Sequence, residues 1–470
     1  DTIRVLTFLR SEISRSMDTE AAGLLDSLRR QRKDSAMFGL ERGQLYEHAR
    51  DYKGAVKEYV PLMKSDTDYV TMEAQRRLTA LLEFSDSRAS IETALLAAAK
   101  NSSNQYLARL LTDHYIKSDQ FDKAYEFAIK RDSLAGLKGS SLIYFMRQCH
   151  DRKLYTQVVR LGDYVLSHYG NGPAYIDASL SYADALAHLG KSPEAIARYD
   201  QLIASSERPQ DKAEALLQIG MVYFDYLKDY TKALVYFDSV VNHYQMGYSF
   251  IGARRMRPYC FIRMGKRVEA RAALSEMKLQ PSMDELNEEV TYQLAMLNFY
   301  DQAYDSASAG LRRMIVDYPR GFYVNDAIQV LAAMDDTKEK PELLPDFATA
   351  LAYEDEEKYD SCRTWLDRVA RVEGSPLADD ALFRLSQVCM KLSDSTGALE
   401  SIDRLTDGFP DSYFIPFGLK QKADILCSRP DRIAEGKELY KRILERYPNY
   451  PLASDVRKRL RTLETDQKIG

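Results

Sequence analysis

Histidine is the residue type in this chain best suited to bind a metal ion or to transfer protons near neutral pH. Six are present: His48, His114, His150, His168, His188 and His243. A zinc-binding helix of the paired-histidine type places two histidines four residues apart, with a glutamate directly after the first. No two of the six have this arrangement, so the sequence predicts no metal site of that kind.

Three other segments hold residues that could do chemistry. Residues 136–141 combine glycine, lysine and serine without the spacing of a phosphate-binding loop or a nucleophile elbow. Residues 407–411 lack the alternating oxygen ligands and central glycine of a calcium loop. We interpret the acidic run 354–357 as the end of one helix and the cap of the next, where its charge favours the helix dipole. We therefore expect no enzyme activity, no catalytic residue, no cofactor and no bound metal.

The cysteines do not form a metal site or a disulfide framework. The chain has five, at positions 149, 260, 362, 389 and 427. They lack metal-ligand spacing, and an odd number cannot form a closed set of disulfides. We interpret them as buried thiols that pack like small apolar residues. Such usage is typical of a cytoplasmic protein.

The composition is that of an ordinary folded protein. Of the 470 residues, 45% are hydrophobic and 29% are charged, and the formal net charge is −5. Because both signs are interspersed, we expect no general nucleic-acid binding, which requires a basic surface. No stretch approaches the roughly 18 to 20 apolar residues of a transmembrane span. Since the chain begins at Asp1, we expect a processed or partial form, and peripheral membrane association through a partner or a missing N-terminal anchor stays an alternative.

One small-residue position recurs along the chain within a repeated helix–turn–helix pattern. We call this position the alanine slot. It is filled by alanine or a substitute at Ala55, Ile91, Ala124, Val158, Ala195, Ala233, Ala270, Ala307, Cys362, Ala398 and Gly436. Neighbouring copies lie about 33 to 38 residues apart, except for one interval of about 55 residues after Ala307. A period of this length predicts pairs of antiparallel helices, each of which buries its apolar face only by stacking on its neighbours.

Two further positions repeat together with this alanine slot. A small residue about twelve positions earlier, such as Gly43 or Ala295, is expected where two helices cross closely. A bulky residue four positions later, such as Tyr59 or Tyr199, is expected to fill the groove toward the next unit. The pattern therefore predicts which face of each helix is buried.

Aromatic–proline pairs at 318–319, 409–410 and 447–448 close their units, because proline cannot continue a helix. Together these phrases resemble the tetratricopeptide repeat family over roughly residues 36–335 and 345–466. The resemblance implies an all-α fold, a right-handed superhelical solenoid of about 11 to 12 antiparallel helix pairs. The aromatic–proline ending resembles the repeats of bacterial cell-envelope proteins, such as the lipoproteins that help to assemble the outer membrane.

The spacing also suggests how the chain is divided. Residues 1–35 are expected to form a degenerate N-terminal helical or capping segment, and residues 36–335 the N-terminal array. Residues 336–345 form either a break between two arrays or part of an insertion in one continuous array. Residues 346–470 are expected to form the C-terminal array, which ends in a capping helix.

In the family that the chain resembles, the first helix of each pair lines the concave side and contacts ligands, which implies two candidate partner-binding groups. The early repeats offer a polar track: Arg109, Asp113, Arg147, His150, Asp184 and His188. The middle repeats offer an aromatic track: Met221, Phe224, Tyr259, Tyr292, Met296 and Phe299. If exposed, the aromatic track would suit a helix or an extended peptide. Aromatic stripes at helical spacing are also typical of a core, and both interpretations stay open.

An array without catalytic residues predicts a protein–protein interaction scaffold. We expect a non-enzymatic subunit or adaptor of a multiprotein complex of the bacterial cell envelope, with protein partners of unknown identity. The alternative is a glycan- or peptidoglycan-binding module, since aromatic faces stack on sugar rings and the chain has 32 tyrosines. The expected location is the periplasm or the outer membrane, and the alternative is the cytoplasm.

Overall fold

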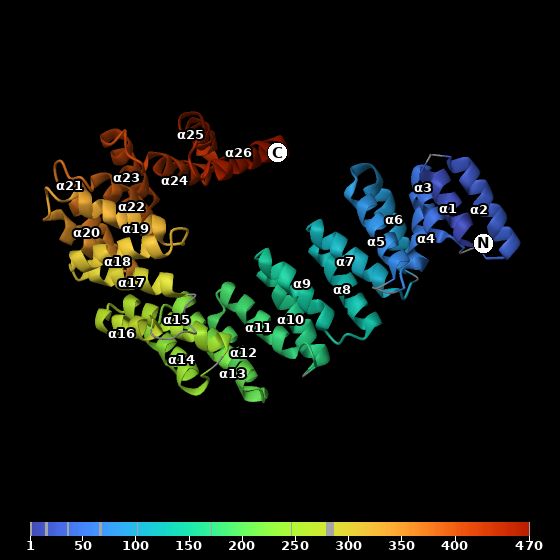
Figure 1. Ribbon diagram of the computed structural model, residues 1–470, viewed down its shortest axis with the longest axis horizontal. Helices are drawn as coiled ribbons and strands as arrows, with labels where there is room; N and C mark the ends of the chain where they lie inside the picture. Colours follow the sequence, from blue (N-terminus) through green and yellow to red (C-terminus); the bar gives the residue numbers. More distant parts are fainter. Residues whose placement is uncertain are drawn as a thin grey trace. The chain divides into compact units, whose positions relative to one another are not determined.

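The computed structural model describes residues 2–14, 17–34, 37–64, 68–100, 102–170, 172–245, 247–278 and 286–469. Across these ranges all regular secondary structure is helical, which confirms the predicted all-α class. The chain packs as two compact units, Asp1–Leu227 and Lys228–Gly470, and within each unit the helices follow one another in chain order (Figure 1). None of the described helices is long and apolar enough to cross a membrane.

The helices of the first unit are α1 (Thr2–Ser14), α2 (Asp18–Arg32), α3 (Gly39–His48), α4 (Tyr52–Tyr59), η1 (Val60–Leu62), α5 (Tyr69–Glu83), α6 (Ser85–Lys100), α7 (Gln105–Lys117), α8 (Phe121–Ala135), α9 (Ser140–Asp151), α10 (Tyr155–Tyr169), α11 (Tyr175–His188), α12 (Ser192–Ser205), α13 (Pro209–Met221) and the π-helix η2 (Val222–Tyr226). Those of the second unit are α14 (Tyr230–His243), α15 (Tyr248–Arg263), α16 (Arg267–Lys278), α17 (Asn287–Tyr300), α18 (Tyr304–Asp317), α19 (Val324–Asp336), α20 (Leu343–Asp355), α21 (Tyr359–Arg371), α22 (Ala378–Lys391), α23 (Ser395–Gly408), α24 (Ile415–Cys427), η4 (Pro430–Arg432), α25 (Ile433–Arg446) and α26 (Ala453–Ile469).

The alanine slot lies near the start of the second helix of each pair, and it is sealed. All ten non-glycine residues at this position, from Ala55 in α4 to Ala398 in α23, are 0% exposed. At the eleventh, Gly436, a Cβ atom would lie 2.3 Å from Cys427 Sγ. The bulky position four residues later is buried as well, as at Tyr59 and Tyr199. The predicted register is therefore confirmed.

The aromatic residue before proline ends the second helices as predicted. Tyr318, Phe409 and Tyr447 cap α18, α23 and α25 at their C-termini with φ values of −130°, −135° and −127°. These residues are therefore not helical, as expected before proline, because the proline ring disfavours the helical conformation of the preceding residue.

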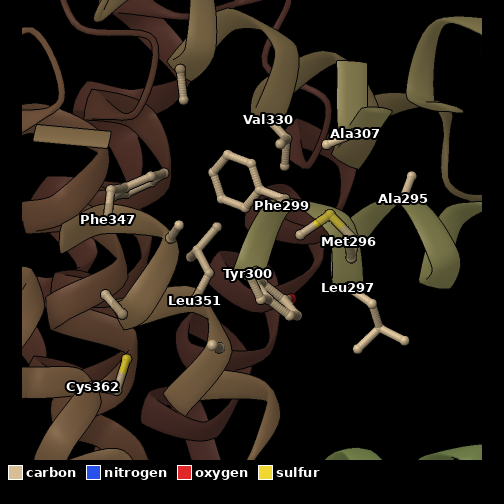
Figure 2. Packing of buried hydrophobic residues seen from close by; sticks show 14 of the residues in the cluster. Ala295, Met296, Leu297, Phe299, Tyr300, Ala307, Val330, Phe347, Leu351 and Cys362 are labelled. Carbon is tan, nitrogen blue, oxygen red and sulfur yellow. The ribbon is translucent and has the colours of Figure 1, made fainter. Parts of the chain in front are cut away.

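The 55-residue interval contains one additional helix. α19 has no second helix of its own, and α20 contacts α17 as well as its partner α21. One cluster of buried apolar side chains extends from Ile262 to Ile425 through this region, and Figure 2 shows its centre, with Phe299 of α17 directed toward Val330 of α19. This shared cluster favours an insertion over a break at residues 336–345, and the division of the chain into arrays stays a prediction. The boundary between the compact units follows Leu227.

The helices of the first 35 residues pack against the start of the array. α1 and α2 pack on each other and on α3, around a small cluster that includes Leu9, Leu25 and Leu45. Arg29 of α2 donates two hydrogen bonds of 2.9 and 2.8 Å to Glu58 of α4, a bidentate geometry that is stronger than a single ion pair. These helices therefore form a further pair at the start of the array.

Candidate functional site on the first helices

Polar side chains link the first helices of successive pairs. In the first unit Arg77 of α5 donates to Glu47 of α3 at 3.2 Å. In the second unit Arg384 of α22 donates to Glu354 of α20 at 3.3 Å. Both pairs are separated by 30 residues in sequence, about the length of one repeat. The second helices thus provide the sealed alanine slots, while the first helices carry polar residues that meet across the repeats.

The polar track contains a compact cluster of two imidazoles and one carboxylate. His150 Nε2 on α9 lies 2.7 Å from Asp184 Oδ2 on α11, and His188 Nε2, one turn further along α11, lies 3.7 Å from the same oxygen. One ligand atom from each residue lies within 4.8 Å of the other two. The three side chains are 41%, 34% and 32% exposed, so solvent reaches the cluster.

Two tyrosines hold the histidine rings in place. The ring of Tyr155, the first residue of α10, stacks on His188 with a centroid separation of 4.1 Å and an angle of 6°. The same ring meets His150 edge-on at 5.6 Å. Tyr226 of η2 forms a 2.9 Å hydrogen bond with His188 Nδ1. Burial and the Asp184 carboxylate raise the pKa of Tyr226 to about 12, so its hydroxyl stays protonated at neutral pH.

The local sequence explains why these groups converge. His150 lies in the last turn of α9, and His188 is the last residue of α11. Each helix is followed by a residue with positive φ, Lys153 at 59° and Gly190 at 76°, which reverses the chain into the second helix. The reversal after α9 returns the chain at Tyr155, beside the histidines. A histidine at a helix C-terminus is also well placed for the helix dipole when it is protonated.

The other residues of the polar track lie around this cluster or on the preceding pair. Arg147 lines a surface pocket of about 340 Å³ together with His150, Asp184 and Glu214 of α13. The Arg147 side chain is 69% exposed, and its Nη2 lies 3.9 Å from Asp177. On α7, Arg109 and Asp113 face each other across one turn at 4.0 Å, and burial raises the pKa of the Asp113 carboxyl. The track is accessible and carries both signs of charge.

The aromatic track is largely packed. Met221 and Phe224 belong to the first unit and the other four residues to the second. Phe224, Met296 and Phe299 are buried, and Phe299 is 0% exposed in the cluster of Figure 2. Met221, Tyr259 and Tyr292 are partly buried. Tyr259 donates to Glu289 at 2.5 Å and Tyr292 stacks on Tyr323 at 4.6 Å. These contacts favour the core interpretation over an exposed apolar trough.

The acidic run 354–357 ends α20 as predicted, but the N-cap of α21 is Lys358, which lies outside the run. The run also joins distant repeats. Glu357 accepts a 2.5 Å hydrogen bond from Tyr230 of α14 and pairs with Lys228 at 3.2 Å. Arg263 at the end of α15 lies 3.6 Å from the same carboxylate. Burial opposes ionisation of Glu357, but the hydrogen bond from Tyr230 and the nearby cations outweigh it and lower the pKa.

The neighbouring residues of this turn extend the junction. Tyr300 of α17 donates to Asp355 Oδ2 at 2.6 Å, and Arg263 donates to the Asp355 carbonyl oxygen. Arg267 of α16 lies 3.5 Å from Glu356. Burial raises the pKa of Asp355 despite these donors. The sequence contains no signal for the junction, because its partners are separated by 55 to 129 residues.

Comparison with known proteins identifies the class. Tetratricopeptide repeat models match residues 214–245 and 347–413. These two segments therefore match tetratricopeptide repeats, and the stacked helix pairs with their sealed alanine slots continue the same arrangement along the described residues. No curated protein matches the chain.

Several solved structures are similar at low identity. The C-terminal part of a repeat-containing protein from Cytophaga hutchinsonii has 13% identity and a TM-score of 0.36, covering 59% of this chain and 99% of its own. A repeat protein from Parabacteroides merdae has 10% identity and a TM-score of 0.29, covering 61% and 98%. Yeast Tom70 has 14% identity and a TM-score of 0.31, covering 100% and 96%. Similarities this low say nothing about what this chain binds.

Proposed function

We propose that this chain is a non-catalytic scaffold that holds protein partners, as a subunit or adaptor of a multiprotein complex. One observation carries the proposal: the second helices seal the core at every alanine slot, whereas the first helices leave a polar track accessible from α7 to α11. Repeat arrays bind through extended surfaces of this kind.

The polar track suits an extended protein segment that carries both signs of charge. Arg109 and Arg147 offer guanidinium groups that are 41% and 69% exposed, and arginine pairs bidentately with carboxylates. Glu214 and Asp184 in the adjoining pocket offer acceptors for basic or amide groups. The apolar groove that we considered from the sequence is a weaker choice, because Phe299 is buried in the core.

The exposed tyrosines favour a protein partner over a glycan. A sugar-binding platform requires aromatic faces grouped on one surface. The most exposed tyrosines, Tyr69, Tyr144, Tyr248 and Tyr413, lie on α5, α9, α15 and the segment before α24, so they are spread along the chain. Cell-wall co-sedimentation would test this directly, and a chain that stays in the supernatant supports the scaffold.

The experiment that tests the scaffold is capture from the native source followed by mass spectrometry. Wild type is compared with Arg109→Ala/Arg147→Ala and with a control, Arg312→Ala/Arg313→Ala, which removes two exposed arginines from the second helix α18. We expect defined proteins on wild type and control and their loss from the track variant. Recovery of wild type only as a free chain would refute the scaffold, and equal capture by all three would refute the polar track as its binding face.

For location, we propose the cell envelope, in the periplasm or at the outer membrane. The support is the resemblance of the aromatic–proline helix ends to repeats of bacterial envelope proteins, seen at Tyr318, Phe409 and Tyr447. All five cysteines are free and buried, an arrangement that requires no disulfide formation in either compartment. Fractionation of the source cells with an antibody to the chain tests the proposal, and recovery in the cytoplasmic fraction would overturn it.

A further inference from the structure

The cluster of His150, Asp184 and His188 has a composition that the scaffold does not require. A single histidine–aspartate pair would suffice to link α9 to α11, but here a second imidazole faces the same carboxylate oxygen. Among the described residues this is the group of histidine, cysteine and acidic side chains whose ligand atoms converge within 4.8 Å. We propose that these three residues bind a divalent transition-metal ion, with Zn²⁺ as the occupant.

The separations between the ligand atoms are close to those that a tetrahedral zinc ion requires. Tetrahedral zinc with bonds of about 2.0 to 2.1 Å separates its ligand atoms by roughly 3.4 Å. The two separations from Asp184 Oδ2 are 2.7 Å to His150 Nε2 and 3.7 Å to His188 Nε2, which lie on either side of that value. The ligand atoms of the two histidines lie within 4.8 Å of each other, so the partly exposed side chains must rotate to close on an ion.

The surroundings already orient His188 as a ligand. Metal-binding histidines direct their second ring nitrogen to a hydrogen-bond partner, which fixes the ring and its tautomer. In the tautomer that leaves Nε2 free to bind a metal, Nδ1–H donates to the Tyr226 oxygen at 2.9 Å, and the stacked ring of Tyr155 restricts rotation. The 3.7 Å gap to Asp184 is longer than a hydrogen bond, so Nε2 points at the cluster with no hydrogen-bond partner among the described residues.

The ligand set favours zinc over the hard cations. Two imidazoles and one carboxylate are ligands typical of Zn²⁺, whereas Ca²⁺ and Mg²⁺ take oxygen ligands. Three protein ligands leave one coordination position for water or for a group from a bound partner. The ion would cross-link the first helices of two neighbouring repeats. The site rests on the geometry of the free chain, so it does not depend on the proposed scaffold role.

The direct test is calorimetric titration of ZnCl₂ into the full chain after treatment with EDTA and desalting. We expect one ion per chain, with affinity at least tenfold lower in His150→Ala and in His188→Ala, and a rise in Tm on zinc addition that both variants lack. Asp184→Asn keeps the shape of the side chain but removes its charge, and it should weaken binding as well. Far-UV circular dichroism checks that each variant keeps its helical content.

His48→Ala is the matched control. His48 Nδ1 pairs with Asp18 at 2.9 Å, so this residue reproduces the histidine–aspartate pair without a converging second imidazole in the described part of the chain. Zinc binding should be unchanged in this variant. Tyr226→Phe removes the hydrogen bond to His188 and should lower affinity by about 10- to 100-fold, which a role of Tyr226 in packing alone would not produce.

Cobalt substitution separates this site from the thiols. Co²⁺ bound by His150, Asp184 and His188 should give the visible bands of a four-coordinate nitrogen–oxygen site, without a thiolate charge-transfer band. The proposal is overturned if the wild-type chain gives no binding heat with ZnCl₂, if binding survives both histidine variants, or if the cobalt complex shows thiolate ligation. Because no partner is present, failure of these tests leaves the capture experiment unaffected, and failure of capture leaves these tests unaffected.

Discussion

Replacing Gly43 with alanine adds one methyl group where α3 crosses α4. A Cβ atom at this position would lie 2.2 Å from Cε1 and 2.5 Å from Cζ of Tyr59. Carbon atoms in contact are normally about 3.5 to 4.0 Å apart, so the ring or a helix must move by more than about 1 Å. Tyr59 is fully buried, and its hydroxyl donates to Glu47. The ring therefore has little room to move.

The depth of this overlap determines how much stability the substitution should cost. Overpacking of a core costs about 1 to 3 kcal/mol, and an overlap this deep belongs at the upper end. Alanine is a better helix former than glycine by about 1 kcal/mol, which offsets part of the cost. We therefore expect Gly43→Ala to lower the free energy of unfolding by about 2 kcal/mol. For a unit of this size, that lowers Tm by about 4 to 8 °C.

The matched control is the same substitution at Gly23 in α2, where a Cβ would meet nothing within 4 Å. Only the gain in helix propensity applies there, so Gly23→Ala should raise the free energy of unfolding by about 0.5 to 1 kcal/mol. Thermal melts followed by far-UV circular dichroism measure both variants. The reasoning predicts Tm shifts of opposite sign, and a Gly43→Ala protein at least as stable as wild type would refute the close crossing of α3 and α4.

Three other substitutions test the packing of the array, each by thermal or denaturant melts against wild type. Ala195→Leu should overpack a sealed slot and cost about 1 to 3 kcal/mol; an unchanged Tm would contradict the repeat register. Phe299→Ala should empty a core site and lower the free energy of unfolding by about 3 to 5 kcal/mol. A much smaller loss of stability would show that this ring is exposed. Glu357→Gln should lower Tm at neutral pH, because the pKa of Glu357 is depressed in the folded chain and its stabilisation is present above the unfolded value of about 4.3. The difference from wild type should shrink as the pH falls below about 4, and a pH-independent difference would assign the effect to packing.

The periodic part of this fold could be predicted because stacking imposes the same packing at the same position of every repeat. Ala195 and Tyr199 are buried for the same reason as their counterparts Ala233 and Phe237: each lies where a second helix meets its neighbours. One small or bulky residue per repeat, at a constant interval, is therefore sufficient to set the register from sequence alone.

The burial of Met296 and Phe299 in the aromatic track could not be predicted in this way, because it depends on a helix that breaks the period. The single helix α19 lets α20 pack against α17, and this packing places Phe299 and Met296 in the same cluster as Phe347 of α20. A regular array would have followed α18 with a complete pair instead. The sequence showed the irregular interval but not which helix face it would cover.

The histidine cluster was missed as a ligand set for a different reason. Metal motifs are sought at spacings that fit one helix, whereas His150 and Asp184 are 34 residues apart and come from neighbouring repeats. The useful signal is the position relative to the alanine slot. His188 and Tyr226 both stand seven residues before a slot residue, at Ala195 and Ala233, and stacking of the repeats brings them together. A search at the repeat period would have found this pair.

The residues seven positions before the alanine slot in the second unit occupy the same place in the fold as His188 and Tyr226, but their side chains differ. Arg263, Tyr300 and Asp355 also end the first helices of their pairs, seven residues before their slots. There the guanidinium and the phenol both donate to Asp355, and the donors are matched by acceptors within a buried junction. In the first unit the corresponding places hold His188 and Tyr226, and Asp184 faces the ring nitrogens of His150 and His188. An imidazole nitrogen can give up its proton and present a lone pair to a metal ion, which a guanidinium cannot do, so the side chains at these helix ends suit a buried junction in the second unit and a ligand set in the first.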